Sequence, residues 1–357
     1  MAPRGIAWAA PLLTVVLLSL ALRPALWGRP RADGPDLILI SLDAVRADHL
    51  GCYGYDRPTT PQLDAFAQSA ERYTRAYCQE PWTLTSHMSM LTGLYPDAHG
   101  VDFGRSLSPK IWTVAERVRE AGYRTWGSVY DCFFLDPRFG YASGFDHYEV
   151  NQTPAHRRCS QAIDWLLEQD RPAFIFLHLY DPHSDTGEVP YEAPREFVER
   201  LAPGAQGVFE GWSGADGASE TLRRVNEEGL AMPDSLRQRL RLLYDAGVAA
   251  TDHAVGGFLD RLRGAGRLER SLVIIVADHG ESLGDHGENT HGFFLYNATV
   301  QVPFMISGPG ISPRRITDPV SLVDVAPTVL DLLGHERGDW IQGRSLTPLL
   351  LGTGDLA

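Results

Sequence analysis

The chain is poor in lysine and cysteine. Its 357 residues include one lysine, Lys110, and four cysteines. No two cysteines stand in a C-x-x-C pair, so the sequence indicates neither a zinc-binding clip nor an obvious disulfide framework. The cysteines therefore decide nothing about the fold.

The chain also lacks net positive charge. Its formal net charge is −13 at pH 7, and the four arginines before Ala32 are the only charges of the N-terminal stretch, so the remainder carries −17 once their +4 is removed. A surface of this charge repels polyanions, which argues against nucleic acid as a partner. An anionic substrate must therefore be attracted locally, by a metal ion, histidine or arginine.

An apolar segment near the N-terminus predicts export. Residues 6–22 are almost entirely apolar, follow Arg4 and contain the small-x-small pattern 19–21, as secretory signals do. The segment is also close to the minimum length of a membrane helix, so an uncleaved anchor is the alternative. We expect residues 1–31 to be a signal peptide or membrane anchor with its linker. The protein would then be secreted, periplasmic or membrane-anchored, facing outside the cytoplasm.

Apolar runs that suggest strands alternate with helical segments. Residues 36–43 and 271–278 are almost unbroken apolar runs, as in strands that are buried on both faces of a parallel sheet. The alternation predicts an α/β fold with a largely parallel central sheet and helices on both faces. Further strands are expected at 125–130, 173–179, 272–277 and 302–306, and helices at 61–71, 111–121, 161–168 and 236–262.

One stretch interrupts this rhythm. Residues 202–232 are rich in Gly, Ser and Glu, which predicts a surface insertion. Two interpretations stay open for it, a solvated loop and a lid.

Two of the predicted strands end in an aspartate, Asp43 and Asp278. Open sheets bind ligands at the carboxyl ends of their strands, so both carboxylates should lie at one edge. His279 follows directly, and Gly280 permits the sharp turn that lets adjacent Asp and His side chains face one ion. Two carboxylates and an imidazole without a cation would repel or stay unsatisfied, which predicts a shared metal ion. A polar strand-end turn is the alternative.

Thr83 and several histidines are the other candidates. Thr83 lies where a turn leads into a predicted short helix, whose partial positive charge favours an anion. Its hydroxyl would need a metal ion or a base to act as a nucleophile. The alternative is that Thr83 or Thr85 caps the helix. His178 and His183 end another apolar strand and bring imidazole to the same predicted edge.

Several motifs, in order along the chain, resemble the sulfatase branch of the alkaline phosphatase superfamily. The resemblance runs from about Asp36 to Leu350 and implies an alkaline-phosphatase-like core, with residues 32–357 as the catalytic domain. It rests on 43–54, Thr60-Pro61, 83–93, Tyr95-Pro96, 99–101, Asp181-Pro-His183, 278–281, Val302-Pro303, 308–310 and 343–346.

The chain departs from the sulfatase pattern at the residues that do the chemistry. Sulfatases have Cys or Ser at the head of C-x-P-S-R-x-x-x-L-T-G and convert it to formylglycine, whereas this chain has Thr83 there and His87 in place of the arginine. Formylglycine cannot form from threonine. His291 stands where sulfatases have the second of two lysines that contact the sulfate, and Ala44 replaces the second aspartate of an Asp-Asp pair.

These departures resemble the threonine-nucleophile members of the superfamily. The resemblance implies that Asp43, Thr83, Asp278 and His279 hold one divalent metal ion. Three oxygen ligands and one imidazole suit Mn²⁺ or Zn²⁺ better than Ca²⁺.

The same resemblance implies how an anionic ester would react. Thr83 would attack phosphorus or sulfur and form a covalent threonine ester. His183 and His291 would bind the non-bridging oxygens or protonate the leaving group, and His87 is a further candidate for this task. The expected function is metal-dependent hydrolysis of a phosphate or sulfate ester. Transfer of phosphoglycerol or phosphoethanolamine to a glycan or lipid is the alternative, and a catalytically silent binding protein is a third reading.

Overall fold

The computed structural model describes residues 34–185, 190–205, 222, 225–229, 232–336 and 338–353. The predicted leader at 1–31 and most of the insertion at 202–232 lie outside the described residues. Within them, every helix is too short or too polar to cross a membrane.

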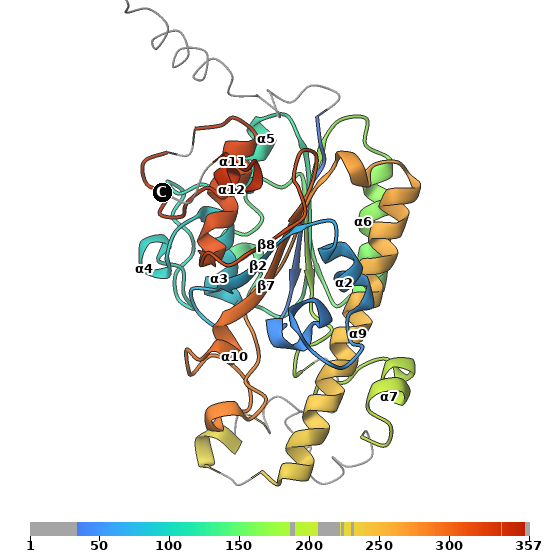
Figure 1. The fold of residues 1–357 in the computed structure, drawn as a ribbon. Helices are drawn as coiled ribbons and strands as arrows, with labels where there is room; N and C mark the ends of the chain where they lie inside the picture. Colours follow the sequence, from blue (N-terminus) through green and yellow to red (C-terminus); the bar gives the residue numbers. More distant parts are fainter. Residues whose placement is uncertain are drawn as a thin grey trace, which may run out of the picture.

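A mixed, mostly parallel sheet of nine strands forms the centre of the described chain, in the order β4-β3-β5-β1-β6-β7-β2-β8, with β9 paired to β2 (Figure 1). Among these strands only β7 runs against its neighbours, β6 and β2. The α/β class expected from the sequence is confirmed. The strands are β1 Leu37–Leu42, β2 Glu71–Tyr77, β3 Arg124–Tyr130, β4 His147–Asn151, β5 Ala173–Leu179, β6 Leu272–Ala277, β7 Gln301–Ser307, β8 Arg314–Ile316 and β9 Val320–Ser321.

Helices cover both faces of the sheet, as predicted. Figure 1 shows α2, α6 and α9 on one side and α3, α5, α11 and α12 on the other. The described α-helices are α2 Pro61–Ala67, α3 Thr83–Thr92, α4 Pro96–His99, α5 Val114–Glu120, α6 Ala155–Leu167, α7 Arg195–Leu201, α9 Asp234–Gly264, α10 Asn297–Val300, α11 Val325–Leu332 and α12 Thr347–Leu350. Short 3₁₀ segments are η1 Ala47–His49, η2 Gly51–Tyr53, η3 Pro137–Phe139, η5 Leu268–Arg270, η6 Asp285–Gly287 and η7 Leu322–Asp324.

The central strands are apolar along their whole length because both of their faces are covered. Every residue of β1, β5 and β6 is buried. Strands that are buried on both faces have no side exposed to solvent, so polar residues do not alternate with apolar ones along them. The continuous apolar runs therefore predicted their positions to within one residue.

Three predicted helix boundaries were wrong. The helix expected at 161–168 begins six residues earlier, at Ala155. The helix expected at 61–71 ends at Ala67, and Glu71 opens β2 instead. This strand alternates buried and partly exposed residues. Because it contains several polar side chains and no continuous apolar run, its sequence does not distinguish it from the preceding helix. The helix expected from 111 begins at Val114, because Thr113 and Glu116 form a reciprocal capping box.

His99 is a buried histidine at the last position of α4. The residue is only 3% exposed, and its Nδ1 accepts a hydrogen bond from the Val101 N–H at 3.0 Å. Burial lowers the pKa of His99 to about 4 from the ordinary 6.5. The folded chain therefore holds this imidazole neutral.

This burial predicts a loss of stability in acid. Between pH 6.5 and about 4 the unfolded chain binds a proton at His99 that the folded chain excludes. The free energy of unfolding should therefore fall by about 3 kcal/mol as the pH is lowered through this range. In urea unfolding at several pH values, His99→Gln should flatten this fall, while His147→Gln, which changes an exposed imidazole on β4, should not. Equal pH slopes for wild type and His99→Gln would refute the assignment.

Candidate active site

Asp43 and Asp278 follow two neighbouring parallel strands at the same end of the sheet. Leu42 of β1 pairs with Ala277 of β6, so the next residue of each strand lies at the carboxyl edge. Both aspartates are fully buried. The backbone fixes them, since Asp43 N–H donates to the Leu179 carbonyl at 2.9 Å.

Each aspartate has one oxygen without a hydrogen-bond partner among the described residues. Asp278 Oδ1 accepts the N–H groups of Ala44 at 3.1 Å and His279 at 2.8 Å, whereas Oδ2 has none. Asp43 Oδ1 likewise has none. Ala44 adopts a left-handed conformation, φ 55°, which turns its N–H toward Asp278. Buried oxygens left in this way cost free energy unless a cation binds them.

His279 presents one ring nitrogen to the same point. Its Nδ1 donates to the Gly280 carbonyl at 2.8 Å, which leaves Nε2 as the nitrogen with a free lone pair. Nε2 lies 3.4 Å from Asp278 Oδ2 and 3.9 Å from Asp43 Oδ1. A backbone bond that fixes the other nitrogen is the usual support of a metal-binding histidine. The ligand atoms of Asp43, Asp278 and His279 all lie within 4.8 Å of one another, close enough to hold one metal ion.

Gly280 also permits a close approach between two segments of the chain. Its φ is not among the positive values of the described chain, so it does not supply a left-handed turn. A Cβ at this position would lie 2.1 Å from the Ala298 carbonyl oxygen. Only glycine lets the chain after His279 pass this close to α10.

Thr83 completes the cluster from a third segment. Its Oγ1 lies 3.3 Å from His279 Nε2 and 3.5 Å from Asp43 Oδ2, and the residue is 2% exposed. The alternative that Thr83 or Thr85 caps the helix is wrong, because Trp82 occupies the N-cap position and no side chain caps α3. The hydroxyl therefore points into the cluster, at the N-terminal end of a ten-residue helix.

The charges of the two aspartates depend on each other. Burial, followed by the charge of Asp278, raises the pKa of Asp43 to about 6. Burial also acts to raise the pKa of Asp278, but the nearby imidazoles, led by His279, outweigh it and lower that pKa. The cluster thus holds excess negative charge that a bound cation would stabilise.

His87 and His178 lie on the buried side of the cluster. His178 Nε2 donates to Asp43 Oδ2 at 2.8 Å, and burial lowers the pKa of His178 to about 3. His87 donates from Nδ1 to the Thr83 carbonyl at 2.9 Å and contacts Ser41 Oγ at 2.8 Å through Nε2. Both rings are fully buried. His87, a candidate for substrate contact, therefore has both ring nitrogens engaged within the protein.

His183 and His291 form a pair on the other side. Their ring centroids are 5.1 Å apart, and that of His291 lies 4.2 Å from His279. His183 Nδ1 contacts Asp185 at 2.6 Å, and His291 Nδ1 contacts Glu281 at 3.2 Å.

Both members of this pair favour the charged form. Burial acts to lower each pKa, but the facing carboxylates outweigh it, raising the pKa of His183 to about 10 and that of His291 above its usual value. Two imidazolium groups in this place could bind an anion. They supply positive charge beside the cluster in a chain that has only one lysine.

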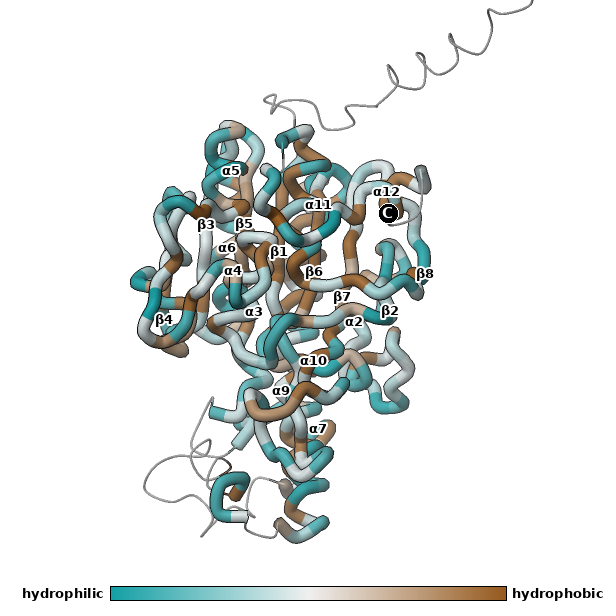
Figure 2. The backbone as a smooth tube through the Cα atoms, turned by 90° about the vertical axis from the view of Figure 1, so that its left-hand side faces the viewer, coloured by the Kyte–Doolittle hydropathy of each residue, from teal (hydrophilic) through white to brown (hydrophobic). Residues whose placement is uncertain are grey.

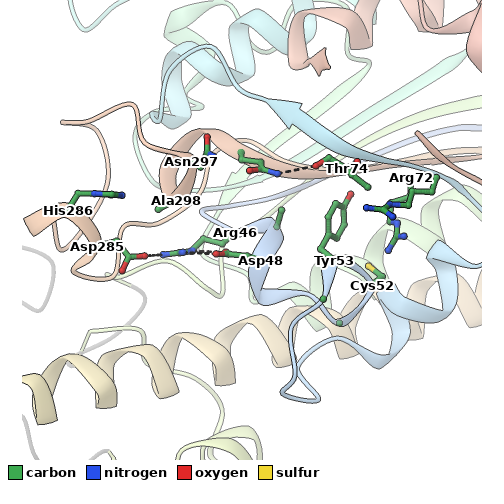
Figure 3. Close-up of a pocket in the computed structure, with 15 residues that line it drawn as sticks. Arg46, Asp48, Cys52, Tyr53, Arg72, Thr74, Asp285, His286, Asn297 and Ala298 are labelled. Carbon is green, nitrogen blue, oxygen red and sulfur yellow. Dashed lines mark hydrogen bonds and ion pairs between the residues drawn. The ribbon is translucent and has the colours of Figure 1, made fainter. Parts of the chain in front are cut away.

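Arg46 braces the loop that follows His279. It is 7% exposed, and its Nη1 donates to the Glu281 and Ser282 carbonyls at 3.1 and 3.3 Å and to Asp285 at 2.7 Å. Figure 3 shows Arg46 between Asp48 and Asp285 at the wall of a cavity of about 630 Å³. Asp43, Thr83, Asp278 and His279 do not line this cavity. Arg46 therefore braces the loop after His279 and makes its side-chain hydrogen bonds away from Asp43 and Asp278.

The structure brings together all four predicted metal-site residues and sets His183 and His291 beside them. Sequence reasoning missed the bond from His178 to Asp43 and the carboxylates Asp185 and Glu281 that face the histidine pair. The signal for His178 was its place at the end of β5. Asp185 stands two residues after His183 and Glu281 two residues after His279, but the sequence does not show that each faces a histidine.

The comparison with known proteins agrees with this arrangement. The profile of the Sulfatase family matches residues 35–335. Arylsulfatase of Clostridium perfringens is 25% identical over 386 residues, which span 88% of this chain and 78% of that protein. Arylsulfatase K of Bos taurus is 37% identical over 377 residues, covering 88% of this chain and 66% of that protein.

Solved structures share the fold. The phosphonate monoester hydrolase of Agrobacterium radiobacter superposes with a TM-score of 0.69 at 22% identity, over 90% of this chain and 78% of that one. The putative sulfatase yidJ of Bacteroides fragilis gives a TM-score of 0.70 at 20% identity, over 90% of this chain and 79% of that one. Because one family profile covers most of the chain and the buried Asp/His cluster lies at the expected edge of the sheet, the chain belongs to the sulfatase family of ester hydrolases, within the alkaline phosphatase superfamily.

Proposed function

We propose that this chain is a metal-dependent hydrolase of phosphate or sulfate esters that works through a covalent ester of Thr83. One observation carries the proposal. The Thr83 hydroxyl lies 3.3 to 3.5 Å from His279 and Asp43, in a cluster with two buried carboxylate oxygens that lack partners among the described residues. The names of the relatives, arylsulfatase and phosphonate monoester hydrolase, support ester hydrolysis at sulfur or phosphorus.

Four atoms would hold the ion: Asp43 Oδ1, Asp278 Oδ2, His279 Nε2 and Thr83 Oγ1. Three oxygens and one imidazole favour Mn²⁺ or Zn²⁺ over Ca²⁺. When bound, the ion would lower the pKa of the hydroxyl and neutralise charge on the transferred group.

The protein's own groups define two steps. Thr83 Oγ1 attacks phosphorus or sulfur and gives its proton to Asp43 Oδ2, 3.5 Å away. As the bond to the leaving oxygen breaks, His183 or His291 donates the proton that this oxygen needs, while the other imidazolium binds a non-bridging oxygen. Water then attacks the same phosphorus or sulfur and gives a proton to the imidazole that protonated the leaving group. The bond to Thr83 breaks, and Asp43 Oδ2 returns its proton to Thr83 Oγ1.

Phosphate esters fit this site better than sulfate esters. The formylglycine precursor and both lysines of typical sulfatases are absent from the matching positions, where Thr83 and His291 stand. We also propose that the chain is exported or anchored in a membrane through its N-terminal segment. Group transfer to an acceptor alcohol is the alternative reaction, and a membrane-anchored chain would favour it.

Replacing the nucleophile should abolish turnover without emptying the site. We expect Thr83→Ala to reduce kcat by about three orders of magnitude or more on whichever of aryl phosphate, phosphodiester, phosphonate or sulfate esters the wild type hydrolyses. Thr85→Ala is the matched control, because Thr85 Oγ1 bonds only the Trp82 carbonyl in the same helix turn. Unaffected turnover in Thr83→Ala would remove Thr83 as the nucleophile.

Neutralising either aspartate should release the metal ion. Asp43→Asn and Asp278→Asn should lower the Mn²⁺ or Zn²⁺ content, measured by elemental analysis, and should lose the rise in Tm that added Mn²⁺ gives the wild type. Asp252→Asn is the control, since Asp252 is another buried carboxylate, bonded to the backbone of α2. Full metal content in both site variants would contradict the assigned ligands.

Product analysis separates hydrolysis from transfer. With glycerol added to a phosphodiester assay, the wild type should release the same amount of the hydrolysis product as without it, because the second step uses water. Quantitative recovery of a phosphoryl group on glycerol would identify a transferase instead.

A further inference from the structure

Exposed apolar side chains gather on three loops rather than being spread over the surface. Among the described residues, the large hydrophobic side chains that are exposed include Phe103 at 60%, Phe133 at 42% and the run 293–296 at 43% to 71%. The others are Tyr95 and Leu167. Figure 2 shows the run before α10 as a brown stretch of the tube.

Trp82 joins these loops. Its ring lies 5.2 Å from Phe103 and 5.5 Å from Phe134, both edge to face, and Phe133 and Phe134 are 5.7 Å apart. A Cβ on Gly292 would lie 3.1 Å from Trp82 Cε3, so the run 293–296 starts against the same ring. We call Trp82, Phe103, Phe133, Phe134 and 293–296 the aromatic rim.

The aromatic rim adjoins the candidate active site on two sides. Trp82 directly precedes Thr83, and Gly292 directly follows His291. The loop that carries Phe133 follows β3, which runs parallel to β5 as β1 does, so it leaves the sheet at the same carboxyl edge as Asp43. The rim is therefore continuous with the place where the ester would react.

Phe133 is held in a costly backbone conformation. Its φ is 71°, in the left-handed region that favours glycine, yet its ring stays partly exposed. The guanidinium of Arg138 lies 4.4 Å from the ring centroid on one face. A strained residue that leaves an apolar ring in solvent indicates a binding role rather than a packing role.

We propose that the aromatic rim binds an apolar leaving group of the ester, so that the preferred substrates are esters of aryl or similar apolar alcohols. This inference rests on the proposed function of the adjoining site. Among the side chains of the rim, only the Trp82 N–H and the Tyr296 hydroxyl can form hydrogen bonds, and the Tyr296 ring is stacked on His286 at 3.7 Å. A leaving group rich in hydroxyls would lose water here without gaining partners, whereas an apolar ring would gain contact area.

The test compares two leaving groups on the full chain. kcat/KM is measured for 2-naphthyl and methyl esters of the acid that the wild type turns over best. Phe103→Ser and Phe133→Ser should each lower kcat/KM for the naphthyl ester about 10-fold, and change that for the methyl ester less than about 2-fold. Leu167→Ser, at a residue 42% exposed on α6, is the matched control and should change neither. Equal effects on both esters, or none, would overturn the inference.

A binding measurement separates this inference from the proposed reaction. Calorimetric titration with 2-naphthol needs no turnover, and the two rim variants should weaken its binding about 10-fold while Leu167→Ser does not. Binding of this kind without any esterase activity would refute the reaction but support the rim. Rim-dependent sedimentation with phosphatidylcholine vesicles, without rim-dependent naphthol binding, would overturn the inference in favour of a membrane contact.

Discussion

Two buried carboxylates brought to one point of the sheet edge are the constraint on which this structure depends. Asp43 and Asp278 are carried to one point by strands that pair in parallel at the centre of the sheet. Each keeps one oxygen free of hydrogen bonds within the described chain, although both side chains are fully buried. Such an arrangement is unfavourable on its own. The His279 imidazole and the Thr83 hydroxyl lie beside these oxygens and would complete a set of ligands for a metal ion.

The histidines around this point divide into two kinds, according to what faces them. His178 is fully buried and stays neutral, which suits it to fixing Asp43 through its Nε2–H. His183 and His291 face carboxylates that favour the charged form, and the His291 ring lies beside His279. The protein thus obtains positive charge at the site from imidazoles held by Asp185 and Glu281, not from lysine.

The sequence predicted the parts of the fold that follow from burial on both faces and the parts of the site that lie at strand ends. Continuous apolar runs located β1, β5 and β6, and the residues after them named Asp43 and Asp278. The sequence could not locate β2, where the partly exposed Arg72 and Thr74 alternate with buried residues, among them the charged Glu71, in a pattern that depends on β7 and β8. It also could not reveal why Gly280 is needed, because the Ala298 carbonyl approaches it from a separate segment.

The central claim is that a single ion joins Asp43, Asp278, His279 and Thr83. Anomalous diffraction from crystals of the full chain soaked in Mn²⁺ tests it most directly. The account predicts one strong peak within bonding distance of Asp43 Oδ1, Asp278 Oδ2 and His279 Nε2, with Thr83 Oγ1 beside it. No peak at this point, with both carboxylates bonded instead to protein groups or water, would contradict it.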